Sequence, residues 1–334
     1  MTPPLKVGVV GLGVGEQHAR AFHAHASCQL KCIYDIDVER AQQLAAKLKG
    51  CSVAADYHSL LNQVDIVAIA SFDDCHYEQV MAALAAGKHV FVEKPVCRTT
   101  EELKAIKSAW LASGGTLKLR SNLILRAAPL YLWLKKQIAS GKLGRIYSFD
   151  GDYLYGRLHK VTEGWRSMVT NYSVLQGGGV HLADLMLWLT AEYPQSVTAV
   201  GNRICTEGTA FRYHDHVTAT FVFSSGMIAR ISSNYGCVHR HHHVMRVFGT
   251  HATFLYDDQG PRWHGSRDPD VTEDRLEASP LPANKGDLIP AFVSAIMDNH
   301  DDRLETQGFL DGISVCIAAD RALASGKKER INYV

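Results

Sequence analysis

The chain has 334 residues, of which 46% are hydrophobic and 21% charged, with a formal net charge of +1 at pH 7. These values are typical of a globular protein long enough for two domains, and they argue against nucleic acid or membrane partners. No apolar run reaches the roughly 18 residues of a membrane helix, and the N-terminus lacks a signal-peptide core. The eight cysteines form no C-x-x-C pair, so we expect a reduced, cytoplasmic protein.

The chain opens with a glycine-rich turn between an apolar strand and a helix. Residues 5–15 read Leu-Lys-Val-Gly-Val-Val-Gly-Leu-Gly-Val-Gly, and the next apolar strand ends at Asp35. Gly11 permits a tight turn, and Gly13 allows the backbone to approach a phosphate at the helix N-terminus. The Asp35 carboxylate can accept a hydrogen bond from a ribose 2′-hydroxyl. The segment therefore predicts a dinucleotide site.

This turn departs from the common pattern at its third glycine. Glu16 stands at the usual position and Gly15 lies one residue earlier, which predicts a turn shortened by one residue. A simple helix-capping turn is the alternative. The strand before it, the helix after it and the following acid favour the dinucleotide site.

The first ~120 residues alternate between strand and helix patterns, which predicts a doubly wound parallel sheet of the Rossmann type in a domain over residues 1–121. The expected strands are 7–10, 30–34, 52–54, 66–70, 89–92 and 116–120. The expected helices are 17–25, 38–49, 76–86 and 100–113.

One strand of this sheet ends in Glu93-Lys94-Pro95. Ligands of such sheets bind beyond the carboxyl ends of the strands, and Pro95 holds Lys94 extended. Lys94 is therefore a candidate catalytic residue, with an ordinary surface lysine as an equally weighted alternative.

Residues 122–334 predict a second, α+β domain that holds a large, mostly antiparallel sheet. The expected strands are 145–155, 196–203, 216–223, 227–235 and 244–248, with a short one at 330–334. The expected helices are 129–140, 180–189, 285–299 and 308–324. Residues 257–284 are polar and contain several prolines, so we expect a loop there.

Several polar side chains of this second region suit a polyhydroxylated or anionic substrate, because forked donors and aromatic faces bind such groups. About half of them are expected to join the domains instead. The candidates are Asn122, Arg126, Tyr153, Arg157, Trp165 and Arg166.

The helix at 180–189 follows a glycine run and carries a buried stripe of leucine and methionine. His181 lies off this stripe in the first turn, where a helix N-terminus favours the neutral imidazole. A neutral imidazole can accept a hydroxyl proton as hydride leaves the same carbon. Asp184, one turn later, is a candidate for structural pairing or substrate contact.

A histidine-rich run occupies residues 239–243. In a strand, His239, His241 and His243 would share one face. No acidic or cysteine ligand lies beside them in the sequence, so we expect an oligomer contact or a substrate-lining face and no metal site.

Together these segments make the chain resemble the superfamily of glucose–fructose oxidoreductase, inositol dehydrogenase and MocA. The resemblance covers nearly the whole chain. It rests on the glycine turn with His18, Asp35, Asp65-Ile66-Val67 with His76, Glu93-Lys94-Pro95, Arg126 with Pro129, Gly141-Lys142-Leu143-Gly144, His181 with Asp184, and Gly249-Thr250.

The resemblance implies an NAD(P)-dependent oxidoreductase that moves a hydride between nicotinamide and a secondary alcohol of a sugar, cyclitol or sugar nucleotide. It implies catalytic roles for Lys94 and His181, converging on one oxygen, and a homodimer or homotetramer. The implied cofactor contacts are Gly11, Gly13, Val14, Gly15, Asp35, Ser71, His76, Glu93 and Lys94. The implied substrate contacts are Asn122, Arg126, Tyr153, Trp165, Arg166, His181 and Asp184.

Two positions depart from the family pattern. Inositol-dehydrogenase-like members carry an aspartate four residues before the histidine, where this chain has Gly177, so inositol itself is in doubt as the substrate. His181 would then act with Lys94 alone, or Tyr153 or Tyr172 would share the proton transfer. Ser71-Phe72 replaces the usual Thr-Pro beside the nicotinamide.

The cofactor and the activity each leave an alternative open. Asp35 and Asp37 would repel a 2′-phosphate, which favours NAD, while the nearby Arg40 leaves NADP open. Some relatives use bound NAD to cleave glycosidic bonds, and a non-catalytic NAD(P)-binding regulatory protein would tolerate the missing carboxylate.

Overall fold

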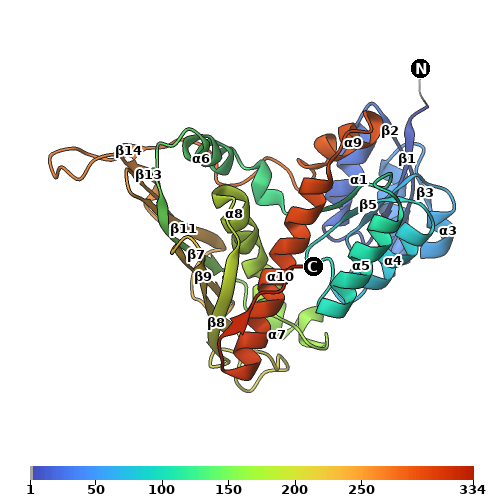
Figure 1. The fold of residues 1–334 in the computed structure, drawn as a ribbon. Helices are drawn as coiled ribbons and strands as arrows, with labels where there is room; N and C mark the ends of the chain where they lie inside the picture. Colours follow the sequence, from blue (N-terminus) through green and yellow to red (C-terminus); the bar gives the residue numbers. More distant parts are fainter. Residues whose placement is uncertain (1–2) are drawn as a thin grey trace. The chain divides into compact units, whose positions relative to one another are not determined.

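The computed structural model describes residues 3–334, and the chain forms two compact units (Figure 1). Unit 1 runs to Ile124 and also includes Pro282–Leu310 and Val334. Unit 2 consists of Leu125–Leu281 and Asp311–Tyr333. Residues 282–310, which the sequence division assigns to the second domain, therefore fold with the first sheet.

Unit 1 is built on the predicted parallel sheet, with strand order β3-β2-β1-β4-β5-β6. Its strands are β1 (Leu5–Val10), β2 (Cys28–Tyr34), β3 (Ser52–Val53), β4 (Ile66–Ile69), β5 (His89–Val92) and β6 (Leu119–Ser121). The central strands are apolar on both faces because helices cover both. The order reverses between β1 and β4, and a doubly wound sheet binds its ligand beside such a reversal.

Helices pack on each side of this sheet. One apolar layer joins α1, α2 and α9 to the sheet through residues such as Phe22, Leu44 and Phe292. On the other side α3 contacts β1 and β2, and α4 contacts β4 and β5. The helices are α1 (Gly15–Ala24), α2 (Val38–Lys47), α3 (Tyr57–Leu61), α4 (His76–Ala85), α5 (Thr100–Ala112) and α9 (Ile289–Met297).

Unit 2 contains a nine-stranded sheet of order β14-β13-β12-β11-β7-β10-β9-β8-β15. Only the β10–β7 pair is parallel among the described strand pairs of this sheet, so the prediction of a mostly antiparallel sheet is confirmed. The strands are β7 (Ile146–Leu154), β8 (Pro194–Asn202), β9 (His216–Phe223), β10 (Ile228–Asn234), β11 (His242–Gly249), β12 (Thr253–Asp257), β13 (Gly260–His264), β14 (Asp274–Arg275) and β15 (Glu329–Arg330).

Helices cover one face of this sheet. Gly151 on β7 lies against Leu182 of α8 (Val180–Thr190), and α6 (Pro129–Ala139) packs on α8. The helix α10 (Arg303–Ser325) begins in unit 1 and continues in unit 2. The remaining helical segments are η1 (Ile124–Ala127), α7 (His159–Thr162), η2 (Trp165–Ser167) and η3 (Leu175–Gly179).

The predicted loop at 257–284 is wrong in part, because it contains β13 and β14. A tight turn joins β12 to β13, and Trp263 of β13 packs edge-on against Trp133 of α6 with ring centroids 5.5 Å apart. The polar composition hides these strands because only one side chain in two is buried in a sheet with one covered face.

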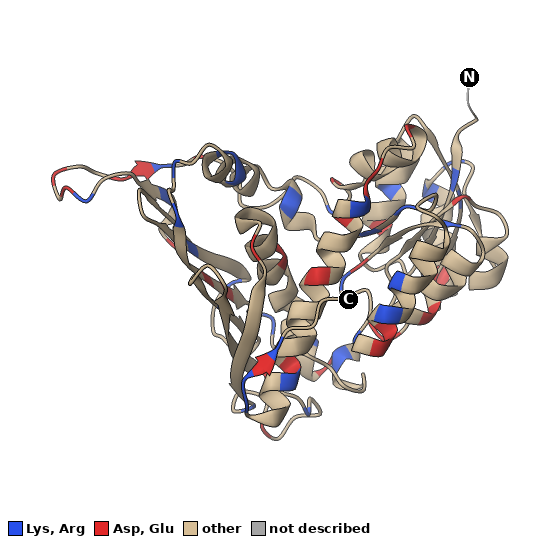
Figure 2. Cartoon of the chain, viewed as in Figure 1, with Lys and Arg blue, Asp and Glu red and all other residues tan. Residues whose placement is uncertain are grey.

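Charged residues of both signs lie along exposed helices such as α5, as Figure 2 shows. Within residues 3–334, no helix combines the length and the apolar character needed to cross a lipid bilayer.

Candidate active site

The glycine turn has the geometry of a dinucleotide cradle. Gly11 has φ +78°, and a Cβ there would meet the backbone of Ala70 and Ser71. A Cβ on Gly13 would meet nothing within 4 Å, so this backbone is open to a bound group. Gly15 begins α1 and lies close to Val9 and Ala70, which is the packing role of the third glycine. The turn is therefore shortened by one residue, as predicted.

Asp35 is aligned by backbone donors at the end of β2. Its Oδ2 accepts a hydrogen bond from Leu12 N at 2.5 Å, and its Oδ1 accepts one from Asp37 N at 2.8 Å. The side chain is 6% exposed, so one edge remains accessible. Arg40 pairs with this carboxylate at 3.8 Å and with Asp37 at 3.3 Å. These residues fit the adenosine half of a dinucleotide, with Val14 exposed beside the turn.

His76 connects the segments that follow β4 and β5. Its Nδ1 lies 2.7 Å from the Pro95 carbonyl oxygen and its Nε2 lies 3.1 Å from that of Ser71. The ring is fully buried, so it holds the two segments together and presents no surface to a ligand. Ser71 donates from its hydroxyl to Gln79 at 2.6 Å, and Phe72 is exposed beside it.

Glu93 is held in a polar cluster inside unit 1. Its Oε1 accepts a hydrogen bond from Asn122 Nδ2 at 2.7 Å and lies 3.2 Å from His18 Nε2. Burial alone would raise the pKa of Glu93, but His18, Asn122 and the charge of Lys94 lower it to about 2. Glu93 is therefore an anion that steadies the segment carrying Lys94, which follows β5.

Asn122 does not belong to unit 2, where the sequence analysis places it as a substrate contact. It is 1% exposed, and its amide also donates to the Lys285 carbonyl oxygen at 3.1 Å. Its position directly after β6 makes it part of the first sheet, so its contacts are internal to unit 1.

In unit 2, His181 lies on a helix that has no free N-terminus. The π-helical turn η3 runs directly into α8, and Gly179 between them has helical φ and ψ angles. The expected effect of a helix N-terminus on His181 is therefore wrong, because the preceding turn covers that end. Such π turns are frequent at functional sites.

The π turn is tied to α10 by Asp320. This carboxylate accepts hydrogen bonds from Ser173 Oγ and Gln176 Nε2, each at 2.8 Å. Burial raises the pKa of Asp320 to about 6 although both hydrogen bonds oppose the change. Asp320 thus fixes the position of the turn that leads to His181.

A wall of aromatic and imidazole rings surrounds His181 within unit 2. Tyr153 on β7 stacks on His181 with centroids 6.4 Å apart, and the rings of His241 and His243 meet Tyr153 edge-on at 5.2 Å each. Tyr155 and Tyr235 extend the wall as a stacked pair at 4.4 Å. Tyr155 and Tyr235 are not among the residues predicted from the sequence. Tyr155 directly follows β7 and Tyr235 directly follows β10, and their spacing from the strand residues is the only signal in the sequence.

Gly177 makes room for tyrosine hydroxyls in this wall. A Cβ at this position would lie 2.3 Å from the Tyr172 hydroxyl oxygen and 2.9 Å from that of Tyr235. The two hydroxyls are themselves 3.3 Å apart. Two phenol hydroxyls therefore occupy the space that a side chain at position 177 would need.

Two arginines border the same wall. The Arg157 Cζ lies 4.7 Å from the centroid of the Tyr155 ring, and that of Arg166 lies 5.9 Å from it. Arg166 also lies over Trp165 at 4.4 Å and donates from Nε to the Tyr172 hydroxyl at 3.0 Å. The candidates Tyr153, Trp165, Arg166 and His181 are thus brought together within unit 2.

Arg126 and Asp184 form an ion pair instead. Arg126 donates from Nε to Asp184 Oδ2 at 2.9 Å and from Nη2 to Oδ1 at 2.6 Å, and Asp184 is 1% exposed. This pair joins η1 to α8, which is the structural role that the sequence analysis left open for Asp184.

His239 does not share the face of His241 and His243. Its ring lies 5.8 Å from that of His242, whereas the rings of His241 and His243 lie 5.0 Å apart and both meet Tyr153. It lies 3.1 Å from Asp258. A hydrogen bond with the Arg240 carbonyl oxygen and, after it, the contact with Asp258 raise the pKa of His239. In residues 3–334, no three histidine, cysteine or acidic side chains gather to hold a metal ion.

Two family models match the chain. Residues 5–119 match "Oxidoreductase family, NAD-binding Rossmann fold", and residues 131–255 match "GFO/IDH/MocA C-terminal domain". The chain is 30% identical to inositol 2-dehydrogenase 2 of Saccharopolyspora erythraea over 201 residues, which cover 58% of this chain and 56% of that protein. It is 26% identical to inositol 2-dehydrogenase of Klebsiella pneumoniae over 98% of this chain and 96% of that protein.

Solved structures show the same fold. Levoglucosan dehydrogenase in complex with NADH has a TM-score of 0.85 at 22% identity, covering 99% of this chain and all of that one. Scyllo-inositol dehydrogenase of Lactobacillus casei with bound NAD(H) and scyllo-inositol has a TM-score of 0.78 at 19% identity, covering 98% of this chain and 99% of that one. With both family models matched and the nucleotide cradle formed, the chain belongs to the Gfo/Idh/MocA family of NAD-dependent oxidoreductases.

Proposed function

We propose that this protein oxidises a secondary alcohol of a sugar or cyclitol with NAD, or reduces the corresponding ketone. The observation that carries the proposal is the ring wall of unit 2, in which the imidazole of His181 stacks on Tyr153. Aromatic walls with a few polar groups suit sugar-like ligands. Relatives named for inositol and levoglucosan support the same class of substrate.

The NAD preference is supported by the acidic residues after β2. Asp35 and Asp37 would lie near a 2′-phosphate, and Arg40 already pairs with both carboxylates. An arginine engaged in this way offers little compensation to an added phosphate. The NADP alternative would require Arg40 to leave its partners.

In the oxidative direction, His181 accepts the hydroxyl proton while Lys94 donates a hydrogen bond to the same oxygen and stabilises its developing charge. When bound, NAD supplies the acceptor for the hydride that leaves the carbon. Glu93 keeps the Lys94 segment in place, and Asp320 keeps the π turn before His181 in place. The family resemblance further suggests a homodimer or homotetramer.

The test is NADH formation by the purified protein with NAD and a panel of sugars and cyclitols. Lys94→Met and His181→Asn should each lower kcat about 100-fold or more, with the Kd for NADH within about threefold of wild type. Lys104→Met and His58→Asn, at exposed positions of unit 1, are the matched controls.

Full turnover by both active-site variants would refute the two assignments. Release of free sugar without NADH accumulation would identify a glycosidase instead. NADH binding without turnover of any compound in the panel would favour a regulatory protein.

A further inference from the structure

Within residues 3–334, no carboxylate of unit 2 forms an ion pair with the guanidinium of Arg157. Arg157 follows β7, is partly buried and stacks over Tyr155 at 4.7 Å. Its Nε is buried and finds no hydrogen-bond acceptor among the residues that the structure describes. Holding a cation partly out of water without such an acceptor is costly, and natural sites usually offset this cost with an anion.

Arg166 places a second guanidinium on the same ring. It lies 5.9 Å from the centroid of Tyr155, while its Nε is committed to the Tyr172 hydroxyl. Tyr155 stacks on Tyr153, which stacks in turn on His181. The two cations therefore border the ring wall that contains His181.

Position 177 places no negative charge beside the two arginines. A carboxylate beside the ring wall would repel a bound anion, and glycine at this position supplies none. Here Gly177 is packed against the hydroxyls of Tyr172 and Tyr235. Burial raises the pKa of Tyr235 well above its usual range, so this hydroxyl stays neutral at physiological pH.

We infer that the substrate of this enzyme is an anionic sugar, whose carboxylate or phosphate is bound by Arg157 and Arg166. The inference rests on the proposed function and specifies its substrate class. Arginine binds both oxyanions through paired donors, so a sugar acid and a sugar phosphate are two sources of the same chemistry.

The experiment compares matched substrates in the NADH assay. Glucose and galactose are tested against glucuronate and galacturonate, and against the corresponding hexose phosphates. A charged hydrogen bond contributes about 1.5–3 kcal/mol, so kcat/KM should be about 10- to 150-fold higher for the preferred anion than for its neutral parent. The better of the two anionic series identifies the source.

Variants of Arg157 test whether this residue causes the preference for an anionic substrate. Arg157→Gln should raise the KM for the anion about 10-fold or more with a small change in kcat, and Arg157→Lys should recover part of the loss. Arg275→Gln, on β14 with a side chain 73% exposed, is the matched control and should leave the KM unchanged. Protection of the folded protein against heat by the anion, without NAD present, should decrease in Arg157→Gln.

The outcomes separate this inference from the proposed function. Turnover of neutral sugars with no gain for either anion would overturn the inference and leave the dehydrogenase activity intact. Heat protection by an anion that Arg157→Gln abolishes, without NADH formation, would support the anion site and contradict the proposed function. An anion preference unchanged in both Arg157 variants would overturn the assignment to Arg157.

Discussion

Gly177 shows how one small residue changes the chemistry of its surroundings. The hydroxyls of Tyr172 and Tyr235 use the space that a side chain at 177 would need, and Arg166 donates to the first of them. The neighbouring Gly178 is equally confined, because a Cβ there would lie 2.3 Å from Tyr153. The turn before His181 therefore requires glycine for close packing against tyrosine rings.

We predict that Gly177→Ala lowers the free energy of unfolding by about 1–3 kcal/mol, because the added methyl displaces packed phenols. Gly179→Ala in the same turn should cost less, since its nearest neighbour is a Leu175 methyl at 3.1 Å. Urea denaturation gives both values. In a double-mutant cycle, Tyr172→Phe should make Gly177→Ala less costly, because it removes the nearest atom. Strict additivity would contradict this account.

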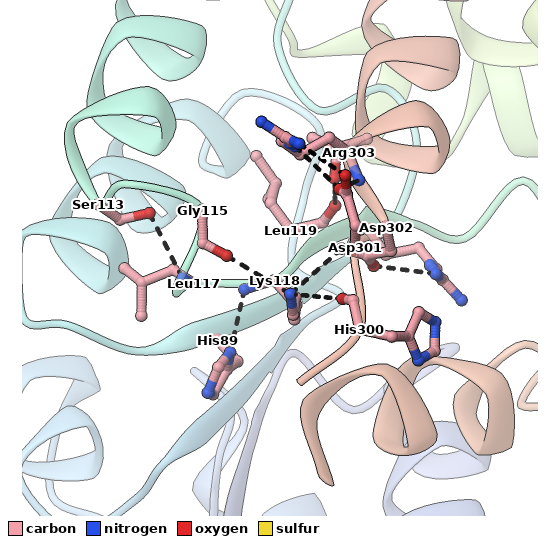
Figure 3. A network of polar contacts seen from close by, with 12 residues as sticks. His89, Ser113, Gly115, Leu117, Lys118, Leu119, His300, Asp301, Asp302 and Arg303 are labelled. Carbon is pink, nitrogen blue, oxygen red and sulfur yellow. Dashed lines mark hydrogen bonds and ion pairs between the residues drawn. The ribbon is translucent and has the colours of Figure 1, made fainter. Parts of the chain in front are cut away.

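At the scale of elements, a buried lysine connects β6 to the segment between α9 and α10. Lys118 donates from Nζ to the His300 carbonyl oxygen at 2.8 Å and lies 3.9 Å from Asp302 (Figure 3). Asp302 also pairs with Arg120 at 3.0 Å. Its side chain is 4% exposed. This cluster helps to explain why residues 282–310 fold with the first sheet, far from it in sequence.

Lys118→Met should lower the free energy of unfolding by about 3 kcal/mol, because it leaves a buried carbonyl group and part of the charge of Asp302 without a donor. Lys104→Met, on the exposed side of α5, should change it by less than about 0.5 kcal/mol. Chemical denaturation monitored by circular dichroism compares the two variants. Equal stability of both would mean that the cluster contributes nothing to the fold.

At the scale of the whole molecule, two groups of unit 1 predict sensitivity to acid. Burial and the charge of Lys118 lower the pKa of His89 to about 4, and its Nδ1 accepts a hydrogen bond from the Lys118 backbone at 3.0 Å. The pKa of Glu93 is about 2. Both values lie below those of the unfolded chain, so protonation favours unfolding in each case.

The stabilisation from neutral His89 is complete above pH 6.5 and should be lost as the pH falls towards 4, and that from Glu93 should be lost between 4.5 and 2. In His89→Asn, the side-chain oxygen still accepts from Lys118 but does not titrate. Between pH 7 and 4.5 the variant should therefore lose less unfolding free energy than wild type, and the difference should be on the order of 1 kcal/mol. His58→Asn is the exposed control. A pH profile identical to that of wild type would exclude His89 as the source.

Local patterns were enough to predict the glycine turn, Asp35, the parallel sheet and the helix that carries His181, because each depends on residues close in sequence. The spacing of Gly11, Gly13 and Gly15 predicts the geometry of the turn, and the spacing of the buried leucines predicts the helix. The same reasoning led to Tyr153, Trp165 and Arg166 as members of one group, which unit 2 brings together.

Other features depend on which distant segments pack together, and only the tertiary structure decides them. Asn122 and Arg126 resemble substrate ligands in the sequence, but Asn122 joins Glu93 and Arg126 joins Asp184. Tyr155 follows β7 and Tyr235 follows β10, 80 residues apart in sequence, and their rings stack because β7 pairs with β10. A sequence states which donors and rings are present, whereas the pairing of strands determines which of them come into contact.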